Sequence, residues 1–154
     1  MEQREAFNLA TKLMMQHELL QNGWMFEFDN AKRRFGCCNH RTKTISLSRE
    51  LVSLNTTERV TNTILHEIAH ALVGRGHGHN GVWKRKAIEI GCDGKRCYTE
   101  ENTNIVKGKF QATCPKCNHV HHKHRKPKRQ KSCGNCSKVF DRERLLVFTI
   151  SENK

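Results

Sequence analysis

Four histidines and one glutamate lie within a single stretch, HEIAHALVGRGHGHNGVW (66–83), and both residue types are common zinc ligands. His66 and His70 are four residues apart, so on a helix they project from the same face at a separation that suits a tetrahedral ion. Glu67 can turn toward a water on the metal instead of toward the metal. This HExxH pattern predicts a catalytic zinc site, in which the ion lowers the pKa of the water and Glu67 takes its proton as general base.

A catalytic zinc with one open position needs a third protein ligand. His77 and His79 both follow the predicted helix in a glycine-rich loop, and their spacing alone does not separate them. The alternative interpretation is an ordinary helix with two packed or solvated histidines. Ile68 and Ala69, between the first two histidines, suit a buried helix and argue against that alternative.

A second metal site is predicted by two cysteine pairs, CPKC (114–117) and CGNC (133–136), which are separated by fifteen residues. Each CxxC pair forms a tight turn, and four thiolates close a tetrahedral zinc site with no position for water. Such a zinc ribbon is structural, and its metal folds the segment around it. A redox-active pair of dithiols is the alternative interpretation. The predicted ligands are Cys114, Cys117, Cys133 and Cys136.

The segment between the two cysteine pairs, NHVHHKHRKPKRQKS (118–132), is strongly basic. We expect a hairpin tip whose cations lie along a phosphate backbone and bind DNA without recognising its sequence. A solvated loop without a partner is the alternative. Its histidines are not needed as ligands, because four cysteines already complete a zinc site. The predicted DNA-binding residues are Lys123, Arg125, Lys126, Lys128, Arg129 and Lys131.

The 154-residue chain carries a formal net charge of +13 at pH 7 and only 36% hydrophobic residues. The charge favours a polyanionic partner, most simply nucleic acid, and the thin core favours stabilisation by metal. Neither a membrane span nor an export signal is indicated, because charged residues interrupt every long apolar run. We therefore expect a monomer in the cytoplasm of a bacterium or phage-infected host, near the nucleoid, with its cysteines as thiols or metal ligands.

The region before the HExxH motif predicts one helix and a small sheet. An amphipathic helix is expected over residues 2–22. Three strand-like stretches follow, at 24–28, 33–38 and 44–48, and turn residues separate them. We expect these stretches to form an antiparallel sheet.

The motif itself lies on a second predicted helix, which begins after Asn55 as N-cap and stops at Gly74. Another short helix is predicted over 82–91. Between Val106 and Phe140 no acidic residue occurs, and this change of composition places a domain boundary near residue 105. The predicted class is α+β, with a first domain over residues 1–105 and the ribbon over 106–154.

Three stretches resemble the SprT-like (Spartan) family of zinc metallopeptidases over most of residues 1–95: RRFGCCNHRTKTISLSRELV, TILHEIAHAL and HNGVW. In that family the third histidine stands four residues before an aromatic residue, which matches His79 and Trp83. His77 has Gly81 at that offset and does not match. The resemblance implies His66, His70 and His79 as zinc ligands, Glu67 as base, and a minimal zincin-like fold with a shallow site. The loop between His70 and His79 is shorter than in many relatives.

The resemblance also implies proteolysis of proteins crosslinked to DNA, and relatives often carry a similar ribbon. The leading hypothesis is therefore a zinc endopeptidase with one catalytic and one structural zinc, recruited to DNA by its ribbon. The alternative is a nucleic-acid-binding adaptor with weak or no proteolysis. Tyr98 is a candidate for stabilising an oxyanion, although nothing in the sequence positions it. Small core residues or free thiols are expected at Cys37, Cys38, Cys92 and Cys97.

Overall fold

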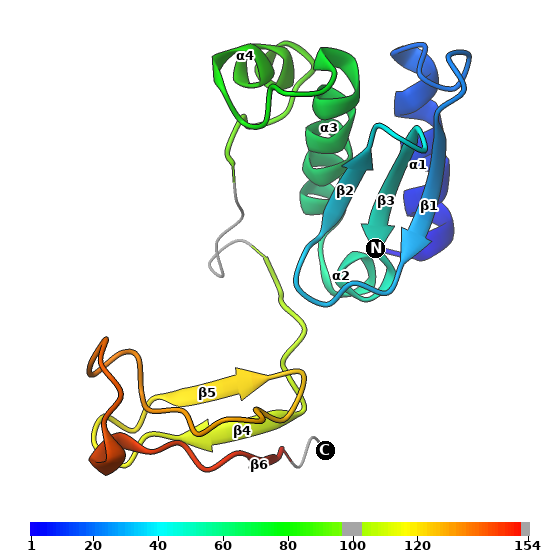
Figure 1. Cartoon of the computed structure of the whole chain (residues 1–154). Helices are drawn as coiled ribbons and strands as arrows, with labels where there is room; N and C mark the ends of the chain where they lie inside the picture. The colour runs from blue at the N-terminus through cyan, green and yellow to red at the C-terminus, as the bar shows by residue number, and fades with distance from the viewer. Residues whose placement is uncertain (97–102, 152–154) are drawn as a thin grey trace. The chain divides into compact units, whose positions relative to one another are not determined.

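A computed structural model of the chain describes residues 1–96 and 103–151 (Figure 1). Two compact units follow one another along the chain, Met1–Val106 and Lys107–Lys154, and we call them the first unit and the ribbon unit. Each has a hydrophobic core of its own. The predicted α+β class is confirmed, since helices cover a small sheet in the first unit and short strands form the ribbon unit. Cys97 and Tyr98 lie outside the described residues.

The first helix, α1 (Gln3–Gln16), is shorter than the sequence predicts. The chain reverses at Glu18, which adopts a left-handed conformation with φ of 57°. The Leu19 N–H then donates to the Met14 carbonyl at 2.9 Å, and the Leu19 side chain returns to the core. The expected extension to residue 22 was wrong, because a non-glycine residue ends the helix and leaves the apolar pattern intact.

Three strands form the sheet of the first unit, in the order β1-β3-β2: β1 (Met25–Asp29), β2 (Gly36–Asn39) and β3 (Thr44–Ser48). β2 and β3 form an antiparallel hairpin, whereas β1 pairs with β3 in parallel. The expectation of an entirely antiparallel sheet was therefore wrong.

Hydrogen bonds from the central strand explain this arrangement. Ser46 Oγ donates to Asp29 Oδ2 at 2.8 Å, and Ser48 Oγ donates to the Ala31 carbonyl at 2.6 Å. These bonds hold the loop after β1 across β3, so the chain reaches the far edge before β2 begins. The alternate residues Ile45 and Leu47 are fully buried in the core. Helices α1 and α3 contact each other, and Figure 1 shows both behind this sheet.

Three further helices complete the first unit: α2 (Arg49–Leu54), α3 (Thr57–Val73) and α4 (Gly81–Glu89). The short α2 was not predicted, and Ser48 caps its N-terminus. Thr56 caps α3, so the assignment of Asn55 to that role was wrong. The Asn55 amide instead donates to the carbonyls of Leu51 and Asn104, both at 2.8 Å. The predicted stop at Gly74 is confirmed, with φ of 80°.

The ribbon unit is a three-stranded antiparallel sheet in the order β5-β4-β6: β4 (Phe110–Thr113), β5 (Val120–Lys123) and β6 (Thr149–Ile150). A single 3₁₀ turn, η1 (Arg142–Arg144), precedes β6. Two buried cysteines, Cys114 and Cys133, form its core with Ala112 and Leu146. Across the described parts of both units, no helix has the length and apolar character that a membrane span requires.

Candidate metal centre

Three histidine side chains converge at one point of the first unit. His66 and His70 project from adjacent turns of α3, and His79 comes from the loop before α4. The His79 Nε2 atom lies 2.9 Å from His66 Nε2 and 3.1 Å from His70 Nε2. Because all three nitrogens point into one small space, they form a donor set that can hold a metal ion.

The loop between α3 and α4 is short, and its two ends are fixed. At one end the Gly74 N–H donates to the His70 carbonyl and ends α3. At the other, Asn80 Oδ1 accepts from the N–H groups of Val82 and Trp83 and caps α4. The loop therefore returns His79 toward the face of α3 that carries the other two histidines. His77 lies elsewhere, with Nδ1 3.4 Å from the Asn80 amide nitrogen, and it is not part of the cluster.

The indole of Trp83 forms the wall behind the three histidines. Its ring centroid lies 4.6 Å from those of His66 and His79 and 5.2 Å from that of His70. The side chain is 1% exposed, so the histidines rest on a fixed aromatic surface. This contact limits ring rotation and preorganises the donor set.

Burial keeps these imidazoles in the neutral form that binds metal. Burial lowers the pKa of His66 to about 3 and that of His70 to about 4, and mutual repulsion between the rings adds to both shifts. The pKa of His79 is also lowered, by burial and by the nearby Arg96 guanidinium. A tetrahedral zinc would separate its nitrogen ligands by about 3.4 Å, so a small outward rotation of the rings fits the donor set to zinc.

Glu67 packs its side chain against the edge strand β2 and lines the same cavity as the three histidines. Its side chain is 7% exposed, and burial raises its pKa to about 8, against the opposing effects of Arg34 and the Cys38 backbone N–H. Gly36 on β2 lies directly against it, because a Cβ at that position would be 2.6 Å from Glu67 Oε1. The carboxyl group thus packs between α3 and β2, beside the histidines.

A cavity of about 390 Å³ opens over this site. His66, Glu67, His70 and His79 all contribute to its lining, so a molecule in the cavity would contact the donor set directly. Basic residues from three separate segments complete the walls: Arg33, Arg34, Arg59, Lys95 and Arg96.

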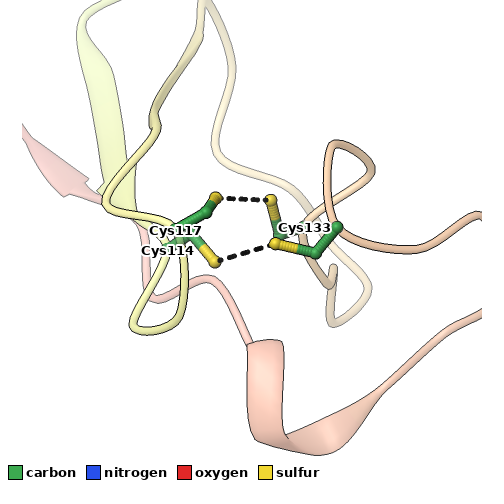
Figure 2. Close-up of side chains that lie close together, drawn as sticks. Cys114, Cys117 and Cys133 are labelled. Atoms are coloured by element: carbon green, nitrogen blue, oxygen red, sulfur yellow. Dashed lines mark hydrogen bonds between the residues drawn. The ribbon is translucent and has the colours of Figure 1, made fainter.

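The four ribbon cysteines form the second cluster. Cys114 Sγ lies 3.9 Å from Cys136 Sγ, and Cys117 Sγ lies 3.7 Å from Cys133 Sγ. Figure 2 shows the sulfurs of the two loops facing one another. Thiolates bound tetrahedrally to one zinc lie about 3.8 Å apart, so the spacing fits zinc without rearrangement. Backbone N–H groups of Cys117 and Lys116 lower the pKa of the Cys114 thiol, which favours the ligating thiolate.

One ribbon histidine contacts this cluster. His121 Nε2 lies 3.2 Å from Cys133 Sγ, and the His121 ring packs on that of His119. The four sulfurs already fill a tetrahedron, so His121 is placed as a hydrogen-bond donor to a ligand and not as a ligand itself.

The six basic residues predicted to bind DNA begin at the last residue of the ribbon's second strand. Lys123 ends β5, and the others occupy the loop that leads to the second cysteine pair. All six side chains are exposed: Lys123, Arg125, Lys126, Lys128, Arg129 and Lys131. Within the described residues, none of the ion pairs involves them. We call this loop the basic tip.

The family model described as "SprT-like family" matches residues 4–106. The chain belongs to the SprT-like family. Among curated proteins, none matches the chain. The SprT-like match covers the whole histidine site and ends where the ribbon unit begins. This family is associated with zinc metallopeptidase-like domains, and the resemblance inferred from the motif is confirmed.

Several residues of the SprT-like site were not identified from the sequence. Gly36 and Cys38 face Glu67 from a strand thirty residues earlier, and only the fold brings them there. The basic runs RRF (33–35) and GKR (94–96) are visible in the sequence. Nothing in the sequence indicates that both runs line one cavity, as they do in the structure. Of the remaining described cysteines, Cys92 is buried and the adjacent Cys37 and Cys38 are half-buried; none of these three belongs to a metal cluster.

Proposed function

We propose that the chain is a zinc-dependent endopeptidase that cleaves DNA-bound or DNA-crosslinked proteins, with the basic ribbon recruiting it to DNA. The observation that carries this proposal is the convergence of three neutral imidazoles beside a buried carboxyl group at the base of an open cavity. SprT-like membership supports the same chemistry.

His66, His70 and His79 would hold the ion. A zinc ion bound there would supply Lewis acidity to polarise a peptide carbonyl and lower the pKa of a water. Glu67 takes the proton from the attacking water and returns it to the departing amine. The contact with Gly36 holds the carboxyl group beside the three histidines, where it can make both transfers.

The ribbon unit supplies the attachment to DNA in this account. Zinc on the four cysteines folds the unit, and the exposed cations of the basic tip contact phosphates without recognising bases. A protein held on the same DNA then reaches the cavity at a high effective concentration. Flexible segments are the expected substrates, because an extended chain can enter a cavity of about 390 Å³.

The test is cleavage of a basic DNA-binding protein, and of the chain itself, with no DNA, single-stranded DNA or double-stranded DNA. We expect cleavage only with DNA, and none by the Glu67→Gln protein. Replacing Lys128 and Arg129 by Gln should weaken DNA binding and lower its salt dependence by about 0.9 in log–log slope per lost phosphate contact. The matched control replaces Arg4 and Lys12, which are exposed on α1. DNA binding with two zincs present but no cleavage would favour the adaptor hypothesis instead.

A further inference from the structure

Positive charge is concentrated around the cavity that contains the histidine site. Among the described residues that line it, five carry a fixed positive charge, whereas the carboxyl groups are those of Asp93 and Glu67. Three separate segments supply the cations: the loop between β1 and β2, the first half of α3, and the loop after α4. Because the cations come from three segments, the positive charge is a property of the folded cavity and not of one basic stretch of sequence.

Two of these cations, Arg34 and Arg59, are held in position by specific contacts. Arg34 Nη1 pairs with Asp29 Oδ2 at 2.8 Å. Arg59 Nη2 donates to Thr63 Oγ1 at 3.3 Å, and its guanidinium lies 5.9 Å from the centroid of the Phe35 ring.

The loop that carries Lys95 and Arg96 is fixed to α3. The Asp93 N–H donates to Asn62 Oδ1 at 2.9 Å, and Asp93 Oδ1 accepts from the Lys95 N–H at 3.0 Å. Asp93 thus uses its carboxylate to hold the loop. The Lys95 and Arg96 side chains are exposed at the mouth of the cavity, and neither has an ion-pair partner among residues 1–96 and 103–151.

The cations and the histidine site line the same cavity. Arg34, Arg59 and Arg96 share its lining with the three histidines. A charged group on a molecule bound over the histidines would therefore lie close to several arginines at once.

We propose that this cavity is a subsite for an acidic side chain of the protein substrate, close to the bond that is cleaved. Aspartate and glutamate carboxylates match the bidentate geometry of arginine, and Lys95 and Arg96 are the residues that select them. The inference rests on the proposed peptidase function and adds its substrate preference.

A peptide is a better match for this cavity than a nucleic acid. The lining contains Glu67 and all three histidines, so the occupant is the chain that reacts. In the proposed function nucleic acid contacts the basic tip, which belongs to the other unit. The two positive surfaces therefore have different tasks, with DNA on the tip and acidic segments of the substrate in the cavity.

Binding to the zinc-loaded, full-length Glu67→Gln protein tests the subsite without any need for turnover. The probes are three fluorescent peptides of one flexible sequence, which carry Glu, Gln or Lys at two adjacent positions. We expect the Glu peptide to bind at least about fivefold more tightly than the Gln peptide at low salt, with a difference that shrinks as salt rises. The Lys peptide should bind most weakly.

Two double variants in the Glu67→Gln background locate the effect. Lys95→Gln with Arg96→Gln should remove most of the preference for Glu. Arg4→Gln with Lys12→Gln makes the same change in net charge on α1 and should preserve it. Equal binding of the three peptides, or an equal loss of preference in both variants, would overturn the proposal. Displacement of the peptide by a single-stranded oligonucleotide, in a protein whose basic tip is neutralised, would also overturn it, because nucleic acid would then be the occupant.

Cleavage of the same peptides by the unmodified chain, with DNA present, separates this inference from the proposed function. Faster cleavage of the Glu peptide supports both. Selective binding of the Glu peptide without cleavage of any peptide supports the subsite and counts against the peptidase. Cleavage of all three peptides at one rate supports the peptidase and overturns the subsite.

Discussion

Gly36 on β2 lies so close to the Glu67 carboxyl group that no larger residue fits between them. A Cβ at position 36 would be 2.6 Å from Oε1 and 2.7 Å from Cγ of Glu67. Strand β2 is therefore the surface against which the predicted general base rests. The position of the carboxyl group depends on this strand as much as on α3, which carries Glu67.

Gly36→Ala should accordingly impair catalysis more than it impairs folding. The added methyl group displaces Glu67, and overpacking of this kind costs about 1–3 kcal/mol of stability. We expect at least a tenfold loss of peptidase activity with the zinc content unchanged. Gly81→Ala is the matched control, because a Cβ at Gly81 meets nothing within 4 Å. Equal activity of the two variants would show that contact with Gly36 does not position Glu67.

Trp83 should report directly on metal at the histidine site. The chain has two tryptophans, so Trp24→Phe leaves Trp83 as the only indole. Its ring lies 4.6 Å from those of His66 and His79, close enough for bound Co²⁺ to quench its fluorescence. We expect strong quenching in Trp24→Phe, weaker quenching in Trp83→Phe, and none once His79→Ala is added to Trp24→Phe. Strong quenching that persists without His79 would place the metal elsewhere.

The stability of the metal-free chain should depend on pH through Glu67. Burial raises its pKa from the usual 4.5 to about 8, so the folded state holds this proton more tightly than the unfolded state does. The resulting stabilisation is fully present below pH 4.5 and is lost as the pH rises through 8. Glu67→Gln lacks this titration, so its stability relative to the parent chain should increase by up to about 1.4 kcal/mol per pH unit across this window.

Urea unfolding in the presence of a chelator, followed by tryptophan fluorescence, measures this difference. Both tryptophans belong to the first unit, so the signal reports on the unit that contains Glu67. The histidines titrate in both proteins and cancel in the comparison. If the free energy of unfolding of the two proteins changed equally with pH between pH 5 and 8, the raised pKa of Glu67 would be contradicted.

His121 should slow the loss of zinc from the ribbon. Its Nε2 lies 3.2 Å from Cys133 Sγ, where a donated hydrogen bond disperses negative charge from the thiolate. We expect His121→Ala to accelerate zinc transfer to a colorimetric chelator about tenfold. His122→Ala is the control, since His122 is the next residue of β5 and is exposed. Identical rates of zinc transfer for the two variants would show that His121 does not stabilise the bound zinc.

Local spacing was sufficient to predict the parts of the two sites that depend on local geometry. His66 and His70 are one helical turn apart, and each CxxC pair occupies one tight turn. The third histidine required the family resemblance, because both His77 and His79 lie in a loop whose path depends on the Asn80 cap. The structure brings His79, and not His77, to the other two.

Features that depend on contacts between distant segments could not be predicted. The parallel pairing of β1 with β3 depends on Ser46 and Ser48, which hold the intervening loop by hydrogen bonds. The early end of α1 depends on the left-handed conformation of Glu18. A glycine at that position would have indicated such a helix end, but a glutamate does not. The positive cavity is formed by residues from segments up to about sixty positions apart, and their sequence shows only dispersed basic residues.

The zinc content of purified protein, measured with its peptidase activity, tests the central claim most directly. We expect two zinc ions per chain in the parent protein and in His77→Ala, with cleavage in both. His79→Ala should retain one zinc and lose cleavage, whereas Glu67→Gln should retain two zincs and lose cleavage. If His77→Ala loses a zinc, or if His79→Ala keeps two and still cleaves, then the histidine site described here is not the catalytic metal centre.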